Sequence, residues 1–483
     1  MQYKTIFRIL GALLMLFSLS MIPPIIVALI YGDGTIDSFV AAFLITFFVG
    51  LCLWLPFYKK SSELKTRDGF LVAVLFWVVL CFFGALPLLF ATDPVMSFTN
   101  AMFESVSGLT TTGATVLTGI DFLPHSLLYY RQQLQFLGGM GIIVLAVAIM
   151  PMLGIGGMQL YRAEIPGPIK ESKLTPRITE TAKTLWLIYI GLTILCALCY
   201  WIAGMTFFDA LGESFTTVAT GGFTMHDNSF AYYHNPGIEI IAIVFMLLGA
   251  TNFSLHFLVL NNKKFSAYWK DIEFKFFRYI LLVVTIITTL TLLRYNIFDN
   301  VKTTLLKASF DTVSMLTTTG FITGNFSTWP SFIPFFIMIF AMVGGCGGST
   351  SGGIKVMRVL LVLKQGFLEL QRLIHPRSVL SLKFGKQILP PYVIGGVSGY
   401  IAIFIFIFII LFLVMLAAGM DVTTAFGAVT ATLANTGASI GGVAHSYQAL
   451  SDLEKWILIF AMLLGRLEIF SILILFTPGF WRR

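Results

Sequence analysis

The sequence predicts an all-α polytopic membrane protein, in which ten transmembrane helices and four re-entrant half-helices form four pseudo-symmetric repeats around one pore. Three observations predict this class. The 483 residues are 57% hydrophobic and only 11% charged, with a mean hydropathy of +0.89, so lipid rather than water is the solvent. The basic residues gather in alternate loops, and a short turn of threonine and glycine recurs four times along the chain.

Ten apolar stretches are long enough to cross a hydrocarbon core of about 30 Å. They lie near residues 7–31, 37–57, 70–92, 129–152, 183–204, 237–260, 277–294, 331–365, 392–418 and 454–478. The first lacks a small-residue cleavage site, so we interpret it as a retained helix rather than a signal peptide. We expect an N-terminal two-helix addition followed by repeats 1 to 4, with boundaries at 1–66, 67–160, 161–265, 266–375 and 376–483.

The basic residues set the predicted topology. Loops after the even-numbered spans, together with the two termini, carry 25 of the 31 Lys and Arg residues. The positive-inside rule places those loops and both termini in the cytoplasm. The net charge of +8 is therefore a topology signal, with anionic lipid headgroups as neighbours. Because no soluble basic domain is present, we expect no nucleic-acid binding.

Cysteine and histidine residues do not form a recognisable site in the sequence. The five cysteines lie in or beside apolar stretches, and Cys196 and Cys199 form a C-x-x-C within a span, without a second pair. We expect packing roles for them and no disulfide framework. His256, at the inner end of the sixth span, has no second ligand nearby and is expected to be a packing residue with satisfied hydrogen bonds.

Four shorter and more polar segments lie between spans three and four, five and six, seven and eight, and nine and ten, at about 98–110, 206–219, 303–317 and 422–434. Each is too short to cross the bilayer, and crossing would place the basic loops on alternate sides. We therefore predict half-helices that enter and leave from the outer face. Each ends in a glycine turn, and the turns, numbered 1 to 4, are Thr110–Gly113, Ala219–Gly222, Thr317–Gly320 and Ala434–Gly437.

The four half-helices align with one another in a way typical of internal repeats. An alanine precedes each glycine by twelve positions, at Ala101, Ala210, Ala308 and Ala425, and the position nine before it holds Glu104, Glu213, Asp311 or Ala428. We favour the interpretation that these acids complement the helix dipole and accept backbone hydrogen bonds near the turns. The alternative is that they attract cations. Arg131, at the outer start of the fourth span, is expected to be an interfacial anchor.

The glycine turns are the candidate ion site. Irregular backbone survives inside a bilayer only where it is buried in protein or lines water. Glycine permits positive φ, so neighbouring carbonyls can face one axis and select a dehydrated cation, as rings of carbonyls do in channels. Mere capping of the half-helices is the alternative, but it does not call for four copies in register. The candidate residues are Thr111, Thr112, Gly113, Thr220, Gly221, Gly222, Thr318, Thr319, Gly320, Asn435, Thr436 and Gly437.

Span eight contains a candidate gate. Six of the ten residues 344–353 are glycine, and each costs about 1 kcal/mol relative to alanine in a helix, so no stable helix is expected there. This segment begins past the bilayer midplane and suits a movable loop beneath the turns. Close helix packing is the alternative, although packing motifs space their glycines. The gate candidates are Gly344, Gly345, Gly347, Gly348, Gly352, Gly353 and Lys355.

Arg466 is a candidate pore barrier. It lies about twelve residues into the tenth span, where a charge is costly and indicates function. Glu468 is two positions further, on the other side of a helix, and is not an intrahelical partner. Facing the pore, Arg466 would raise the energy of a cation below the turns. A salt bridge to another helix is the alternative.

These motifs together resemble the Trk/Ktr/HKT superfamily of potassium transporters, and most closely its bacterial Trk-type membrane subunits. The resemblance covers essentially the whole chain. The residues that carry it are Phe103-Glu104-Ser105, Gly108–Ala114, Phe136 with Gly138–Ile142, Gly221-Gly222-Phe223, Gly344–Lys355 and Gly465–Glu468. The resemblance implies potassium permeation through a single protomer in a bacterial inner membrane, a homodimer, and a cytosolic nucleotide-binding regulatory ring of the RCK type. The transported potassium ion is the expected ligand, and we expect no nucleotide site on this chain.

The resemblance also bears on selectivity and on the alternatives. In this superfamily glycine in all four turns accompanies potassium permeation, whereas serine in the first accompanies sodium preference; here the residues are Gly113, Gly222, Gly320 and Gly437. Basic loops 261–278 and 355–389 are the expected docking surface of the regulatory ring. A sodium-permeable or ion-coupled transporter remains the runner-up. An intramembrane serine hydrolase using Ser349 or Ser351 is remote, because no histidine base lies at that depth.

Overall fold

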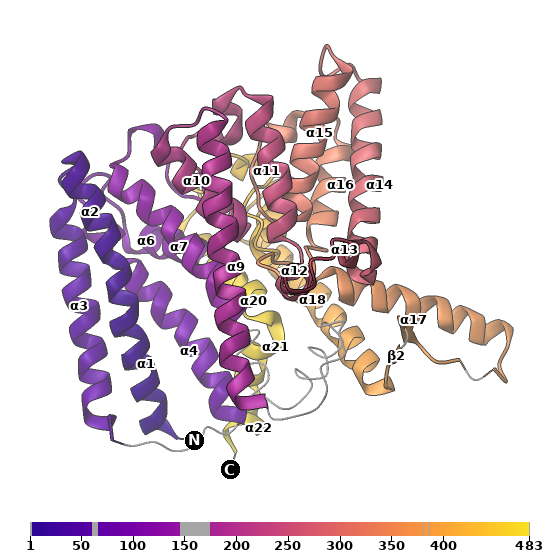
Figure 1. The fold of residues 1–483 in the computed structure, drawn as a ribbon, viewed down its shortest axis with the longest axis horizontal. Coiled ribbons are helices and arrows are strands. Elements are labelled where there is room, and N and C mark those ends of the chain that lie inside the picture. The colour runs from indigo at the N-terminus through magenta and orange to yellow at the C-terminus, as the bar shows by residue number, and fades with distance from the viewer. Residues whose placement is uncertain (1, 60–65, 145–173, 379, 386, 483) are drawn as a thin grey trace.

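The computed structural model describes residues 2–59, 66–144, 174–378, 380–385 and 387–482. The described chain is predominantly helical, as predicted (Figure 1). One short antiparallel hairpin, β1 (Lys383–Phe384) with β2 (Gln387–Ile388), is a small departure from the all-α class. The helices are α1 (Tyr3–Ser18), α2 (Ile22–Tyr31), α3 (Ile36–Trp54), α4 (Thr66–Gly84), α5 (Leu86–Phe90), α6 (Phe98–Leu109), α7 (His125–Val144), α9 (Leu174–Ile202), α10 (Phe207–Ala219), α11 (Pro236–Gly249), α12 (Phe253–Asn262), α13 (Ser266–Lys270), α14 (Ile272–Arg294), α15 (Val301–Leu316), α16 (Phe332–Ala341), α17 (Val356–Ile374), α18 (Pro391–Ala417), α19 (Val422–Leu433), α20 (Asp452–Arg466), α21 (Glu468–Leu473) and α22 (Pro478–Trp481).

Six helical stretches of the described chain are long and apolar enough to cross a membrane. They match the predicted spans one, two, three, five, seven and nine, and they make this a multi-pass membrane protein. The stretches are Tyr3–Tyr31, Ile36–Phe57, Arg67–Phe90, Ala182–Ile202, Ile272–Arg294 and Pro391–Ala417. The predicted fourth span, 129–152, is α7 up to Val144. Its remainder, the end of repeat 1 and the basic residues of 145–173 lie outside the described residues.

Spans six and ten differ from the continuous helices that we expected. Helices α11 and α12 meet at 96°, and α20 meets the helix after it at 107°. Two local features produce the breaks: Asn252 caps α12 by accepting the amide of Ser254 at 2.8 Å, and Glu468 has a positive φ of 53°. Span eight is interrupted between α16 and α17 by residues 342–355, as the glycine content predicted.

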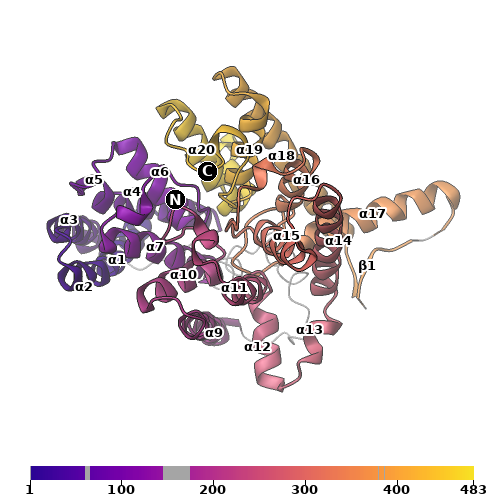
Figure 2. The ribbon, with the colours of Figure 1, turned by 90° about the horizontal axis from the view of Figure 1, so that it is seen from above.

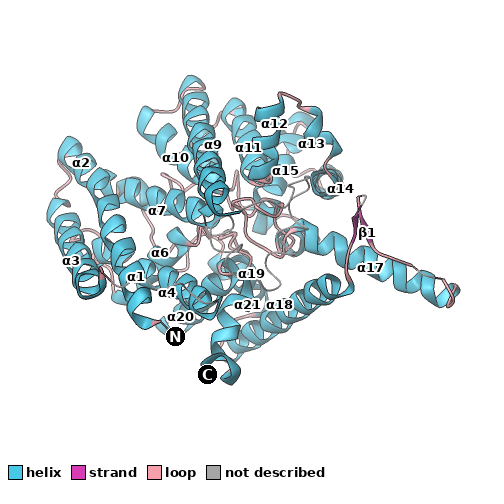
Figure 3. Cartoon of the chain, turned by 60° about the horizontal axis from the view of Figure 1, so that its bottom comes forward, coloured by secondary structure: helices cyan, strands magenta, loops and turns pink. Residues whose placement is uncertain are grey.

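The half-helices α6, α10, α15 and α19 occupy the predicted segments and pack in a closed cycle. Each contacts the second helix of the preceding predicted repeat: α10 contacts α7, α15 contacts α11, α19 contacts α16, and α6 contacts α20. The last pair joins the first repeat to the fourth. Viewed from above, these helices surround a common centre (Figure 2), and the irregular backbone gathers inside them (Figure 3).

Two regions lie outside this ring. Helices α1 to α3 form one edge of the molecule (Figure 1), and α1 approaches α3 so closely at Gly11 and Gly50 that a Cβ on either would overlap the other's backbone, as small residues allow between membrane helices. Helix α17 projects away from the body, with the β1–β2 hairpin beside it (Figures 1 and 2). The described ends of the chain lie on the same side (Figure 1).

Candidate functional site

The four glycine turns share one unusual backbone conformation. Each glycine has a left-handed φ, of 85°, 88°, 85° and 76° in turns 1 to 4. Two residues earlier Thr111, Thr220, Thr318 and Asn435 are also left-handed, with φ of 50–55°. The residue between them is not left-handed in any turn. Left-handed non-glycine residues cost about 1–3 kcal/mol and cluster at functional sites, and here four equivalent positions adopt them.

The turns touch one another in a closed ring. A Cβ placed on the glycine of each turn would overlap the carbonyl oxygen that precedes the glycine of the next turn. The contacts join Gly113 to Gly221, Gly222 to Thr319, Gly320 to Thr436 and Gly437 to Thr112. The structure therefore brings all twelve candidate residues of the turns to one centre. Each turn requires glycine for two reasons: its φ is positive, and the carbonyl of the next turn leaves no room for a Cβ.

The acids of the half-helices support the backbone just beyond the turns. A carboxylate oxygen accepts the amide of the third residue after each glycine in turns 1 to 3, from Val116 to Glu104 at 3.1 Å, from Met225 to Glu213 at 2.8 Å and from Thr323 to Asp311 at 3.1 Å. This confirms the expected backbone hydrogen bonds. Turn 4 has Ala428 at this position and is braced differently, because the Tyr447 hydroxyl donates to the carbonyl of Gly437 at 3.0 Å.

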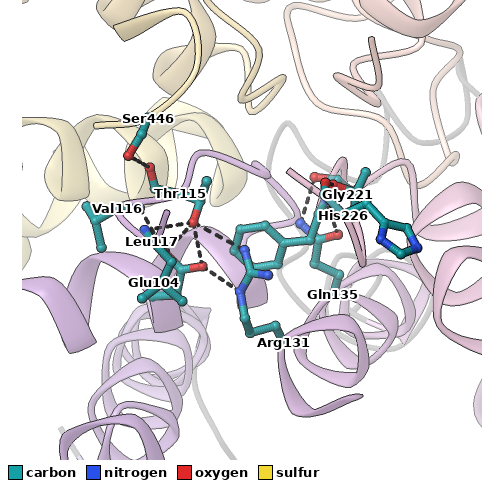
Figure 4. Close-up of polar contacts among 11 residues, drawn as sticks. Glu104, Thr115, Val116, Leu117, Arg131, Gln135, Gly221, His226 and Ser446 are labelled. Atoms are coloured by element: carbon teal, nitrogen blue, oxygen red, sulfur yellow. Dashed lines mark hydrogen bonds and ion pairs between the residues drawn. The ribbon is translucent and has the colours of Figure 1, made fainter. Parts of the chain in front are cut away.

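Arg131 is not an interfacial anchor, contrary to our expectation. Its side chain is fully buried, and Nε lies 2.7 Å from Oε1 of Glu104, which is buried as well. Nη2 donates to the hydroxyl of Thr115 at 3.2 Å, and the guanidinium lies 4.3 Å from the centroid of the Phe223 ring (Figure 4). The prediction failed because α7 begins at His125, earlier than expected. Arg131 therefore lies inside the helix rather than at its mouth.

Above turn 2 the structure reveals a polar cluster that the sequence did not indicate. His226 Nδ1 lies 2.5 Å from Asp121 of repeat 1, and Nε2 lies 3.7 Å from Asp209 of α10. The imidazole stacks on Tyr232 with centroids 3.4 Å apart. Burial by itself lowers the pKa of His226, but the hydrogen bonds and charge of Asp209 and Asp121 outweigh it, so the pKa is raised.

The glycine-rich segment 344–353 lies against the inner ends of the half-helices. The Thr350 hydroxyl donates to the carbonyl of Val218 at 3.0 Å, and that of Ser351 donates to Thr317 at 2.7 Å. The Gly352 amide donates to the Thr318 hydroxyl at 2.7 Å. The segment is therefore bonded to the end of α10 and to turn 3, and a Cβ on Gly352 would overlap the carbonyl of Ala434 in turn 4.

The lower side of this segment is also held in place. Glu273, on α14, accepts the amide of Gly347 at 2.7 Å and that of Met357 at 3.2 Å through one oxygen. The amide of Cys346 donates to Ala250 at the break between α11 and α12, at 2.9 Å. Lys355, with a φ of 80°, turns its Nζ back to the carbonyl of Ser351. Gly344, Gly348 and Gly353 have positive φ, so the segment is a compact folded loop.

Arg466 connects this segment to the first repeat. Nη1 donates to the carbonyl of Thr350 at 2.9 Å, and Nη2 donates to that of Gly138 on α7 at 3.1 Å. The side chain is 3% exposed, and it forms no ion pair with an acidic side chain among the described residues. Glu468 pairs instead with Arg358, at 2.9 Å. Arg466 thus places a positive charge beside the segment.

The remaining candidates have ordinary structural contacts. Ser349 donates to the carbonyl of Cys346 at 2.5 Å, and the Ser351 hydroxyl is bonded to a carbonyl as well. His256 bonds the Tyr268 hydroxyl at 2.6 Å and the Leu248 carbonyl at 2.9 Å, which confirms the expected satisfied packing residue. Gln135, Glu273 and Tyr447 were missed. In the sequence, the only indication of these residues is that each is a polar residue inside or beside an apolar stretch.

A multi-pass membrane protein with four equivalent turns closed around one axis, and a folded loop below them, has the architecture expected of a membrane transport protein. Comparison with known families makes this specific. The family model TrkH, described as a cation transport protein, matches residues 35–482. The chain belongs to this family, whose members are transporters rather than enzymes, and this removes the hydrolase alternative.

Individual relatives cover the whole chain. It is 51% identical over 482 residues to the Trk system potassium uptake protein TrkH of Salmonella typhimurium, with 100% of both chains covered. It is 52% identical over 483 residues to the TrkH protein of Halomonas elongata, again over 100% of both chains. It is also similar to the crystal structure of the potassium transporter TrkH from Vibrio parahaemolyticus, with a TM-score of 0.93, 48% identity and 100% coverage of each chain.

Proposed function

We propose that this protein takes up potassium by selective permeation through the ring of glycine turns. The observation that carries the proposal is the cyclic contact of each glycine with the carbonyl of the next turn. Such a ring presents one equivalent carbonyl from each repeat, and carbonyl oxygens replace the hydration shell of a cation. The names of the relatives favour potassium as the ion. The ring consists of residues 111–113, 220–222, 318–320 and 435–437.

The glycine-rich segment and Arg466 form the proposed gate and barrier. The segment lies directly below the ring, and its hydrogen bonds to Thr317, Thr318 and Val218 would have to break before an ion could pass. Arg466 adds a positive charge at the same level, which raises the energy of a cation there. In this proposal Gly344, Gly345, Gly347, Gly348, Gly352, Gly353 and Lys355 move together when the pore opens.

The proposed assembly places both termini and the basic loops in the bacterial cytoplasm, beside anionic lipids. A cytosolic nucleotide-binding ring would dock on loops 261–278 and 355–389 and move the segment through α17, which begins three residues after it. A second copy of the chain completes the assembly. Exposed apolar residues on α17 support protein contacts there, with Leu363 48%, Phe367 67%, Leu370 59% and Leu373 79% exposed. The repeats have the boundaries 67–160, 161–265, 266–375 and 376–483.

Cation flux into liposomes tests the proposal. Two purified proteins are compared, the wild type and a variant in which residues 344–353 are shortened to release the gate. For each, the flux of potassium, rubidium, sodium and lithium is measured. We expect potassium and rubidium to pass well ahead of sodium and lithium, and Gly113→Ser to weaken this preference because any side chain there overlaps the Gly221 carbonyl. Equal flux of potassium and sodium in the wild type would favour the sodium-permeable alternative. No flux even with the segment shortened would refute a pore.

A further inference from the structure

Turn 2 lacks the internal hydrogen bond that braces turns 1 and 3. In turn 1 the hydroxyls of the first and third residues are 2.7 Å apart, and in turn 3 they are 2.8 Å apart. The corresponding residues of turn 2 are Ala219 and Gly221, which carry no hydroxyl. Turn 2 has the same left-handed backbone as the others, so another group must support it.

Gln135, on α7 of the preceding repeat, supplies that support. Its Nε2 donates to the carbonyl of Gly221 at 2.7 Å, and its Oε1 accepts the amide of Phe223 at 3.0 Å, so the two bonds straddle Gly222 (Figure 4). The side chain is fully buried. A Cβ on Gly221 would overlap this amide group. Gln135 and Gly221 therefore fit as a pair, and the amide occupies the space that a threonine at 221 would need.

The same face of α7 also holds turn 1. Arg131 lies one helical turn before Gln135, pairs with Glu104, and packs its guanidinium on the ring of Phe223, whose amide Gln135 binds. Glu104 in turn supports Val116, just beyond turn 1. One helix face thus fixes the backbone of two neighbouring turns relative to each other.

We infer that Gln135 is a positioning residue that determines ion specificity, by fixing the direction of the Gly221 carbonyl. This inference rests on the proposed function. The Gly221 oxygen is the one that contacts Gly113 across the ring, so releasing it changes the distance between repeats 1 and 2. Potassium and sodium differ in size and in the carbonyl field that they need. A released carbonyl can follow the smaller ion, so discrimination falls while permeation continues.

Rubidium uptake by potassium-depleted bacterial cells tests this, with the full chain expressed in a strain that lacks other high-affinity potassium uptake. Potassium or sodium is added as a competitor of rubidium in separate experiments. The readout is the ratio of the sodium concentration to the potassium concentration that halves rubidium uptake. Gln135→Leu removes both bonds at similar volume. Gln135→Glu keeps an oxygen that accepts the amide of Phe223, but it places a second carboxylate oxygen, which cannot donate a hydrogen bond, against the Gly221 carbonyl. We expect both to lower the preference for potassium about three- to tenfold, as loss of a buried hydrogen bond allows.

Gln133→Leu is the matched control, because Gln133 lies on the same helix and donates to Ser20 at 2.9 Å, away from the turns. We expect its ratio to equal that of the wild type. The rescue variant combines Ala219→Thr, Gly221→Thr and Gln135→Ala, which gives turn 2 the hydroxyl pair of turn 1; we expect it to restore most of the preference. A purely structural role would lower uptake and protein level without changing the ratio.

The outcomes separate this inference from the proposed function. Wild-type uptake that sodium inhibits as well as potassium does would overturn the proposed function and the inference with it. Potassium-selective wild-type uptake with an unchanged ratio in Gln135→Leu, at normal protein level in the membrane, would overturn the inference alone.

Discussion

The ring of glycine turns and the glycine-rich segment below it use the same residue in opposite ways. In the ring one glycine from each repeat has the same φ and the same contact with its neighbour, so the four positions are equivalent. The segment occurs once, between α16 and α17, and its contacts with Val218, Thr317 and Arg466 differ from one another. In the proposed function, the symmetric ring selects the ion, and the single segment that interrupts the symmetry forms the barrier.

Replacing one ring glycine should have the largest effect. In Gly320→Ala the new Cβ overlaps the carbonyl of Thr436, and alanine at a φ of 85° costs about 1–2 kcal/mol. We expect potassium uptake to fall at least about tenfold, or its preference over sodium to disappear, in the rubidium uptake assay.

Gly204→Ala is the control for backbone strain. Gly204 has a φ of 107°, but nothing lies within 4 Å of the added Cβ. We expect this variant to retain uptake. If both variants lose uptake equally, the strain of the positive φ and not the ring contact explains the loss.

Removing the charge below the ring should have the next largest effect, in the opposite direction. Arg466→Met abolishes the bonds to Thr350 and Gly138 together with the positive charge. We expect potassium flux into liposomes to rise about tenfold, equivalent to about 1.4 kcal/mol of barrier. Arg466→Lys keeps the charge but cannot bridge two carbonyls as guanidinium does, so its flux should rise less. An unchanged flux in Arg466→Met would refute the barrier.

The sequence predicted the elements of both regions better than the contacts between them. Glycine turns, half-helices and the loss of helix at 344–353 follow from local composition, and the structure places them where the sequence did. The bends at Asn252 and Glu468 were missed, because each combines a cap or a positive φ with an apolar run that continues past it. The contacts of Arg131 and Gln135 were also missed. They join segments 27 and 86 residues apart, and no local pattern encodes such a pairing.

Loosening the attachment of the segment should have a moderate effect. In Glu273→Gln a neutral amide oxygen replaces the carboxylate that accepts from Gly347 and Met357, and charge-assisted hydrogen bonds are about twice as strong as neutral ones. In liposomes without the cytosolic regulatory ring, we expect potassium flux to rise about threefold, with an unchanged preference for potassium over sodium. Glu239→Gln on α11 is the control, since Glu239 pairs with Lys307 at 2.6 Å instead. A changed preference would mean that the segment also shapes the ring.

The smallest effect concerns the outer loops, where His226 joins repeat 2 to Asp121 of repeat 1. The pKa of His226 is raised in the folded protein, so its protonated form stabilises this contact below its usual pKa of about 6.5. That stabilisation is lost as the pH rises through the raised value. The amide of Asp227 donates to Asp121 at 3.4 Å, so its rate of hydrogen exchange measures the stability of the contact between His226 and Asp121.

After correction for intrinsic rates, we expect about twofold faster exchange at pH 8.5 than at pH 6, the size of a partly exposed ion pair. His226→Gln carries no titrating group and should exchange equally at the two pH values. Potassium preference should not change over this range, because the backbone of turn 2 is held from below the loop by Gln135, whose amide does not titrate. A preference that follows the titration of His226 would show that the outer loops, and not only the buried supports, set the geometry of the ring.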